Sequence, residues 1–345
     1  MNLADSDIRS RLLMARLPAM PQILLKLLEL CQSDDTGLSE IASLVAKDPG
    51  ITCKIMALAN SSAFHRGGAK VGLEQSVATI GTDMIKTLVI SESVFQVFNG
   101  FSHSTGTDLR SFWKHSITAA IVAREIAQKT GYPNLEEAYL SGLLHDVGRL
   151  ALLSAAAKEY AYVFFTADDD NLCAIEQSTL NLTHTEAGAW LIERWNLDSF
   201  ISDSVLYHHE KPERLADAHP LVRIILLSNL LGIHAKGHPS LQEAAETLDL
   251  DIATLDGIVN AAGVRVAKLA EMLDIDLTGA DDLVVPTASW EIAGKIAGLE
   301  EAATANGKPA KQSERIATPQ EVAQRQLSGE IHNMMLAQHV QQGFE

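Results

Sequence analysis

Gly142-Leu-Leu-His-Asp-Val-Gly-Arg149 is an apolar helical run, broken by glycine, that contains the adjacent residues His145 and Asp146. We expect the helix that leads into it to run to Gly148. Because neighbouring residues on a helix diverge by about 100°, both side chains can reach one point only near a helix end. The dipole of a helix C-terminus favours a cation at such a place. The segment therefore predicts a helix whose C-terminal end lies at a candidate metal pocket.

Three further helices carry histidines on their inward faces. His115 falls in the apolar stripe of a helix expected over residues 109–129. His184 lies in the first turn of a helix that a capping box at residues 183–186 begins, and the helix N-terminus should keep it neutral. His208 ends a helix and shares its apolar side. Taken singly, His115 is better explained as a core histidine bonded to a neighbouring carbonyl, and His184 is equally well explained as a capping-region residue packed on Trp195, whereas His208 is favoured as a ligand.

Taken jointly, four inward histidines and one aspartate from separate helices favour a metal or polar-ligand pocket, because every buried imidazole needs a partner. Mixed imidazole and carboxylate ligands suit Fe, Mn or Zn. The adjacent His209 is read as an exposed residue in preference to a further ligand. Arg149 is read as a surface arginine, with binding of a nucleotide phosphate or another anion as the alternative.

Composition indicates an all-α chain, since only 5% of the residues are aromatic and alternating Val, Ile and Thr runs are lacking. The net charge of -17 repels phosphate backbones and anionic lipids, so neither nucleic acid nor a membrane is an expected partner. Cys31, Cys53 and Cys173 lack metal-type spacing and sit in apolar helical contexts, which predicts buried, reduced thiols. A cytoplasmic location, without an export or anchoring signal, is the expectation.

Glycine, proline and polar loop residues along the chain suggest that it has four parts. They are an N-terminal segment (1–16), an N-terminal helical subdomain (17–100), a helical core (107–276) and a polar C-terminal tail (277–345). The tail has the composition of a linker followed by one amphipathic helix over residues 320–340, which could pack on the body or form a homodimer. Within the subdomain, residues 38–46 and 50–60 could form a DNA-binding helix-turn-helix, but the second helix carries a single lysine, so this is a minor alternative.

Short motifs from residue 17 to residue 236 strengthen this interpretation. They are Leu17-Pro-Ala-Met-Pro21, Lys47-Asp-Pro49, Leu58-Ala-Asn-Ser61, Leu73-Glu-Gln-Ser-Val77, Ile80-Gly81, Trp113-Lys-His115, Gly142-Leu-Leu-His-Asp-Val-Gly148, His184-Thr-Glu-Ala-Gly188, Glu193-Arg-Trp195 and His208-His209. With these motifs the chain resembles the HD superfamily of metal-dependent phosphohydrolases, and more closely its HDOD branch of bacterial signalling proteins. The resemblance implies an HD-like helical bundle with an N-terminal helical subdomain.

The resemblance also implies a ligand set, because related HD enzymes hold metals with a His, a His-Asp pair, further His residues and a final Asp. The matching positions are His115, His145, Asp146, His184 and His208, with His209 and Asn229 less favoured. The final Asp falls on Asn229, and a Glu that some members add falls on Ser111. Asn229 cannot neutralise charge, so we expect one divalent metal or none, and a two-metal site is not favoured.

The replacement of the final Asp by Asn229 and of the Glu by Ser111 favours a cytoplasmic bacterial signal-transduction protein. Its HD-type domain would be catalytically degenerate and would act by protein interaction or ligand sensing. The alternative is a metal-dependent phosphohydrolase, a phosphodiesterase or nucleotidase, that works with a reduced ligand set. In that case His145 and Asp146 would be central ligands and Arg149 would hold the phosphate.

Overall fold

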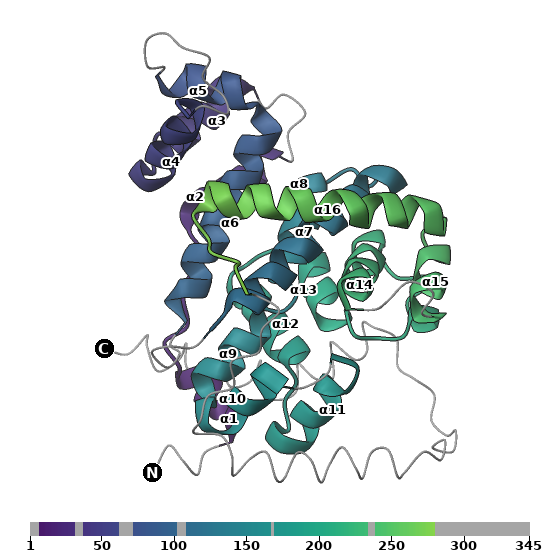
Figure 1. The fold of residues 1–345 in the computed structure, drawn as a ribbon. Coiled ribbons are helices and arrows are strands. Elements are labelled where there is room, and N and C mark those ends of the chain that lie inside the picture. The colour runs from purple at the N-terminus through teal and green to yellow at the C-terminus, as the bar shows by residue number, and fades with distance from the viewer. Residues whose placement is uncertain are drawn as a thin grey trace. The chain divides into compact units, whose positions relative to one another are not determined.

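A computed structural model of the chain describes residues 7–31, 37–61, 72–101, 108–166, 169–233 and 239–279, all within one compact unit, Met1–Ala297. This described part is built from helices and their connections, with no strand among its residues (Figure 1). The predicted all-α fold is thereby confirmed. The amphipathic helix expected over residues 320–340 lies outside the described residues.

Short helices form the N-terminal part of this unit. Their bounds are α1 (Ile8–Met14), α2 (Gln22–Cys31), α3 (Leu38–Val45), α4 (Pro49–Ala59), α5 (Leu73–Ile80) and α6 (Thr82–Gly100). Helix α4 begins as its sequence suggests, because Asp48 accepts a hydrogen bond from the backbone N–H of Ile51 at 2.9 Å and proline follows at the first helical position. Helix α6 packs against α2 and α5, and also against α8 of the following part.

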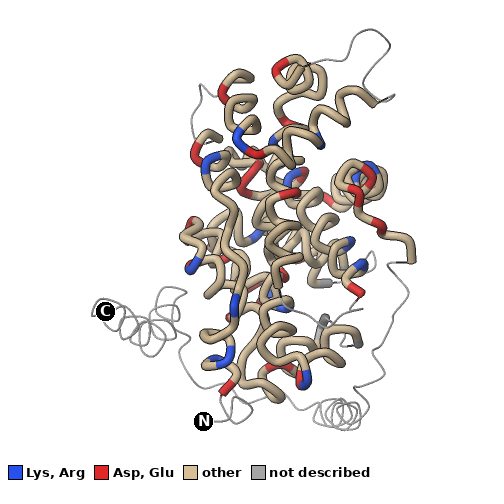
Figure 2. The backbone as a smooth tube through the Cα atoms, turned by 90° about the vertical axis from the view of Figure 1, so that its left-hand side faces the viewer, with Lys and Arg blue, Asp and Glu red and all other residues tan. Residues whose placement is uncertain are grey.

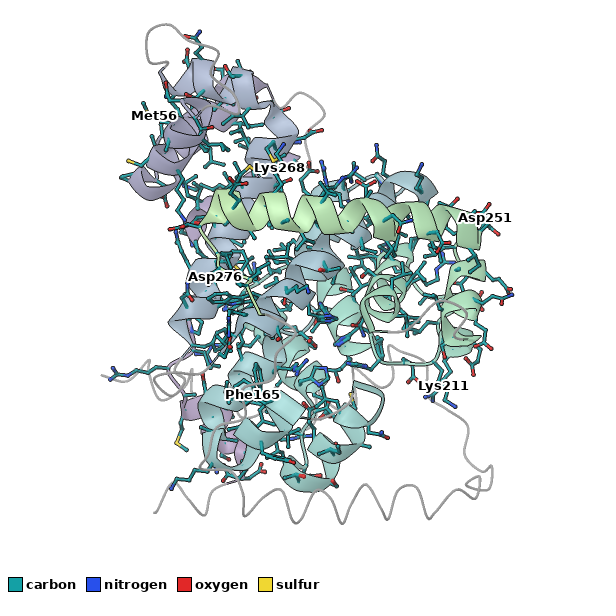
Figure 3. All side chains as sticks on the ribbon, viewed as in Figure 1. Met56, Phe165, Lys211, Asp251, Lys268 and Asp276 are labelled. Atoms are coloured by element: carbon teal, nitrogen blue, oxygen red, sulfur yellow. The ribbon has the colours of Figure 1, made fainter. Side chains whose placement is uncertain are left out.

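The remaining helices form a bundle around α7. Their bounds are α7 (Arg110–Thr130), α8 (Leu135–Leu144), α9 (Val147–Ala155), α10 (Ala157–Thr166), α11 (Asp169–Leu180), α12 (His184–Arg194), α13 (Ser199–Leu206), the 3-10 turn η2 (Pro212–Arg214), α14 (Pro220–Ile233), α15 (Pro239–Glu246) and α16 (Ile252–Leu273). Helix α7 packs against α8, α14 and α16, while α12 packs against α9 and α13. Figure 3 shows α16 lying across the bundle, with Asp251 at its start and Asp276 just beyond its end.

The helix expected to run to Gly148 is in fact two helices. Helix α8 ends at Leu144, His145 and Asp146 form the junction, and α9 begins at Val147. Asp146 has φ -99° and ψ 7°, outside the helical region, and so redirects the chain. The pair of residues therefore lies at a helix end, as expected, but it also begins a second helix.

Two glycines set the helix spacing around this junction. A Cβ atom on Gly142 would lie 2.8 Å from the carbonyl oxygen of Ala119, so α8 rests directly on the backbone of α7. A Cβ atom on Gly148 would lie 1.8 Å from the carbonyl oxygen of His184, so α9 rests directly on α12. Only glycine permits such close approaches of one backbone to another. These contacts bring the histidines of α7 and α12 to the junction.

Local structure differs from simple sequence patterns at three places. The side-chain oxygen of Asn134, which precedes α8, makes no capping hydrogen bond, although its amide group donates to Glu137 at 3.3 Å and Glu137 also accepts from the hydroxyl of Tyr132 at 2.5 Å. At the start of α6 the residue in the N-cap position is Gly81, with φ 93°, and not the threonine that follows it. The cysteines are less buried than expected, since Cys53 is exposed and the other two are half-buried, although all three thiols are free.

Acidic and basic residues are interspersed along the described helices, as Figure 2 shows. Ion pairs join several of them, such as Lys54 with Glu92 at 2.6 Å and Lys86 with Glu136 at 3.2 Å. Within the described residues, every helix is too short or too polar to cross a membrane.

Candidate metal centre

Five of the predicted ligands meet in one place at the α8–α9 junction. They are His115 from α7, His145 and Asp146 from the junction, His184 from the start of α12 and His208 from the end of α13. All of them are buried except His115, whose side chain is 19% exposed. The structure therefore brings the whole predicted set together.

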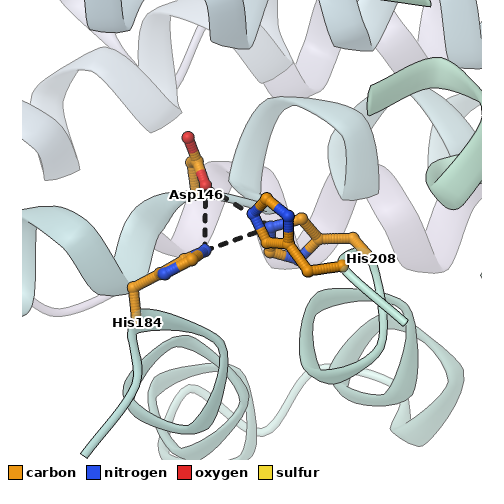
Figure 4. Close-up of side chains that lie close together, drawn as sticks. Asp146, His184 and His208 are labelled. Atoms are coloured by element: carbon orange, nitrogen blue, oxygen red, sulfur yellow. Dashed lines mark hydrogen bonds and ion pairs between the residues drawn. The ribbon is translucent and has the colours of Figure 1, made fainter. Parts of the chain in front are cut away.

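The Asp146 carboxylate lies at the centre of this cluster. Its Oδ1 is 3.4 Å from Nε2 of His184 and 3.5 Å from Nε2 of His208, as Figure 4 shows. Its Oδ2 is 3.9 Å from Nε2 of both His115 and His145. Oδ1 is buried and accepts no hydrogen bond from any described residue. A buried carboxylate oxygen without a hydrogen bond is costly unless a cation satisfies it.

Each buried imidazole is oriented through its other nitrogen. Nδ1 of His145 donates to the carbonyl of Gly142 and Nδ1 of His208 donates to the carbonyl of Val205, both at 2.7 Å. Nδ1 of His184 donates to a carboxylate oxygen of Glu176, also at 2.7 Å. With Nδ1 donating outward, Nε2 of each ring is directed toward the cluster, and in the neutral rings of His145 and His208 it carries a lone pair. Histidines that bind metals are held in this way.

Electrostatics set the protonation of the rings. Burial lowers the pKa of His145 to about 3 and also lowers the pKa of His208, so both rings are neutral near pH 7. Burial likewise opposes protonation of His184, but Glu176 outweighs it and holds the pKa of His184 well above its usual value. The raised pKa favours a second proton on this ring, against the expectation that the helix N-terminus keeps His184 neutral. A metal at Nε2 would displace that proton.

Arg149 is part of the centre and is not a surface residue as expected. Its side chain is 13% exposed, and it donates from Nη1 to Oδ2 of Asp146 at 3.0 Å and from Nη2 to the carbonyl of Phe164 at 3.0 Å. Its guanidinium also lies 5.1 Å from the centre of the Phe164 ring. Burial alone would raise the pKa of Asp146, but His145 and Arg149 outweigh it and hold that pKa well below its usual range. Asp146 is therefore ionised.

His209 and Asn229 lie beside the cluster. His209 was expected to be exposed, but it is half-buried and its ring centre lies 5.0 Å from that of His184. Its ring offers a nitrogen within 4.8 Å of the ligand atoms of Asp146, His184 and His208. Asn229 is buried and its amide donates to the carbonyl of His208 at 3.4 Å. The metal-binding roles of both residues remain predictions.

Two groups of possible ligand atoms share Asp146, and a third contains Cys173, Glu176 and His184. The Oδ1 group contains Asp146, His184, His208 and His209, and the Oδ2 group contains His115, His145 and Asp146. In the Oδ2 group the two imidazole Nε2 atoms hydrogen-bond to each other at 2.9 Å and Arg149 occupies the carboxylate oxygen. In the Oδ1 group the carboxylate oxygen is available. The donor set of the Oδ1 group fits a divalent cation of the Fe, Mn or Zn type.

Glu176 on α11 contacts the cluster and was not among the residues that the sequence analysis singled out. Its side chain is fully buried and touches the cluster only through His184. The sequence contains a signal for it, because Leu172, Glu176 and Leu180 share one face of the helix at a spacing of four residues and both leucines are buried. An acid inside an apolar stripe needs a buried partner.

The HDOD domain family model matches residues 17–211 of the chain. A curated protein from Treponema pallidum, described as uncharacterized, is 24% identical over 217 residues, which are 62% of this chain and 42% of that protein. The match thus spans less than half of that relative's length.

Solved structures with the same fold include three bacterial proteins. An HDOD domain protein of unknown function from Geobacter sulfurreducens is 23% identical, with a TM-score of 0.58, covering 81% of this chain and all of that one. A proposed phosphohydrolase from Shewanella amazonensis is 20% identical, with a TM-score of 0.57 and coverage of 79% and 99%. A proposed signal transduction protein from Marinobacter aquaeolei is 20% identical, with a TM-score of 0.60 and coverage of 78% and 61%. At these identities the likeness establishes the shared fold.

Proposed function

Since the chain belongs to the HDOD domain family, we propose that it is a cytoplasmic bacterial signalling protein whose HD-type pocket holds one divalent cation and no longer hydrolyses phosphoesters. In this proposal the domain acts by binding another protein, and the cation stabilises the conformation that binds. The fold that it shares with a proposed signal transduction protein from Marinobacter aquaeolei supports the proposal.

The observation that carries the proposal is the contact of Arg149 with Oδ2 of Asp146 at 3.0 Å. A second cation would have to be held by the other group of ligand atoms, which contains Oδ2 of Asp146 with His115 and His145. Here a guanidinium already provides the positive charge beside Oδ2, and a second divalent cation close to it would be repelled. Only Oδ1 is left for a metal ion.

Charge supports the same conclusion. Asp146 and Glu176 bring two negative charges to the interior, and Arg149 brings one positive charge. A single divalent cation leaves the pocket with one excess positive charge, whereas two cations would leave three. Asn229 stands where related enzymes have an acid, and its amide adds no charge. Burying so large an excess is unfavourable in a low-dielectric interior.

The single cation would be held by Asp146, His184 and His208, with His209 as the fourth ligand. When bound, a divalent cation can polarise a phosphate and lower the pKa of a coordinated water. The chain's own residues orient the ligand rings and exclude water from them. Removal of the cation is therefore expected to reduce stability and partner binding.

A hydrolysis assay tests the proposal. Purified protein supplied with Mn²⁺, Fe²⁺ or Zn²⁺ is expected to show no turnover of a phosphodiester, a nucleotide or a cyclic dinucleotide above that of Asp146→Ala. The Asp146→Ala variant controls for contaminating hydrolases, because it retains the surface of the wild-type protein. Turnover in the wild-type protein that Asp146→Ala abolishes would contradict the proposal.

A metal-dependent phosphohydrolase with a reduced ligand set is the second candidate. It is favoured by the available Oδ1 of Asp146 together with the ring nitrogens of His184 and His208. The fold shared with a proposed phosphohydrolase from Shewanella amazonensis agrees with this alternative. Arg149 would then have to leave Asp146 to bind phosphate. The same assay separates the two candidates, because this one requires turnover that Arg149→Ala reduces.

A further inference from the structure

We infer that Glu176 is a positioning residue of the metal pocket. Glu176 orients the ring of His184 as a metal ligand, and through this ring it supplies negative charge to the pocket. Asn229, which is neutral, does not supply such charge. The inference rests on the proposed function, because it concerns the same pocket. Glu176 contacts Nδ1 of His184, the ring nitrogen opposite Nε2, so it would act through this ring on a cation held at Nε2.

The geometry of Glu176 is fixed on both of its oxygens. Oε2 accepts from Nδ1 of His184 at 2.7 Å and from the backbone N–H of the same residue at 2.8 Å. Oε1 accepts a short hydrogen bond from the hydroxyl of Tyr160. All three side chains are fully buried. The ring of His184 is therefore locked in the tautomer that points Nε2 at Oδ1 of Asp146, 3.4 Å away.

Burial of a carboxylate at this place calls for an explanation. Its hydrogen-bonding partners in the described residues are a tyrosine and a histidine, with no lysine or arginine among them. Taking a carboxylate out of water costs several kcal/mol unless a cation compensates it. Capping of α12 alone would not require a charge, because the amide oxygen of glutamine accepts the same bonds. A cation at Nε2 of His184, either a proton or a metal ion that replaces it, would provide the compensation.

The carboxylate also strengthens the ligand. A histidine that donates Nδ1–H to a carboxylate is a more basic metal ligand than one that donates to a carbonyl. His145 and His208 donate to carbonyls, and His184 alone among these three donates to a carboxylate. Since His184 belongs to the Oδ1 group, the extra charge reaches the cation that this group would hold.

The experiment compares Glu176→Gln with the wild-type chain. Glutamine keeps the size of the side chain and can accept from His184 while its amide group donates to Tyr160, so only the charge is removed. Affinity for Co²⁺ and Mn²⁺ is measured by calorimetry, and the ligand-field absorption of bound Co²⁺ is recorded. We expect about 10- to 100-fold weaker binding and a shifted Co²⁺ spectrum. The matched control is Glu243→Gln, the same change at an exposed position on α15, which should bind like the wild-type protein.

Each outcome has one meaning. Unchanged affinity and an unchanged spectrum in folded Glu176→Gln, with a wild-type protein that binds Co²⁺, would overturn the inference and leave the proposed function intact. Absence of binding by the wild-type protein would overturn both. If Glu176→Gln does not fold, proton NMR of the metal-free wild-type protein decides: a strongly deshielded Nδ1 proton on His184 is expected, and its absence would contradict the inference.

Discussion

Asp146→Asn is expected to destabilise the metal-free protein by about 3–5 kcal/mol, which is the usual effect of removing one member of a buried ion pair. Arg149 would keep its positive charge while losing the carboxylate that it contacts at 3.0 Å. Nε2 of His184, which lies 3.4 Å from the same carboxylate, would also lose a neighbouring negative charge. Equilibrium unfolding in urea with a chelator present measures the loss without any contribution from bound metal.

The double variant Asp146→Asn/Arg149→Met is the control for this prediction. Methionine removes the unpaired charge and retains most of the volume, so the double variant should recover part of the stability lost in Asp146→Asn. A single variant within about 1 kcal/mol of the wild-type protein, or a double variant less stable than the single one, would show that the two residues are not coupled as described.

Gly148→Ala is expected to be the most disruptive change outside the ligands. Its Cβ would lie 1.8 Å from the carbonyl oxygen of His184 and 2.6 Å from the backbone nitrogen of Gly188, so α9 and α12 must separate. Overpacking of this kind costs about 1–3 kcal/mol, and the upper end or more is expected here because both obstacles are backbone atoms. Separation would also move His184 away from Asp146. Thermal unfolding and Co²⁺ titration measure the two effects.

The matched control is Gly263→Ala on α16, where an added Cβ meets no atom within 4 Å. There the same substitution should stabilise the protein by about 0.5–1 kcal/mol, because alanine loses less backbone freedom in a helix. If Gly148→Ala were to unfold at the temperature of Gly263→Ala and bind Co²⁺ normally, the close approach of α9 and α12 would not be what builds the pocket.

The sequence was sufficient to predict the fold class and the clustered ligands. Apolar spacing placed His115 and His208 on inward faces, and the capping box placed His184 at the start of its helix, with the Glu186 N–H bonded to Thr183 at 3.2 Å. These signals are local, because they depend on residues within one or two helical turns. The motifs along residues 17–236 then connected them to one family.

What the sequence did not predict depends on how helices meet. The apolar pattern continues across the break between α8 and α9, so it does not predict this break. The pairing of Arg149 with Asp146 follows from the break. His209 turns inward because the chain leaves α13 at that point, where helical periodicity no longer applies. Glu176 was not predicted because its partner, His184, lies on another helix. The apolar stripe that contains Glu176 indicates that its side chain is buried, but it does not identify the residue that binds it.

The measurement that tests the one-cation pocket most directly is metal content per chain, by plasma mass spectrometry, on tag-free protein purified without chelator. Asp146→Ala serves as the control. About one equivalent of Fe, Mn or Zn in the wild-type protein, lost in Asp146→Ala, is the predicted result. About two equivalents would contradict the account, because Arg149 would then not exclude the second cation, and no metal in either protein would show that the buried cluster does not act as a metal site.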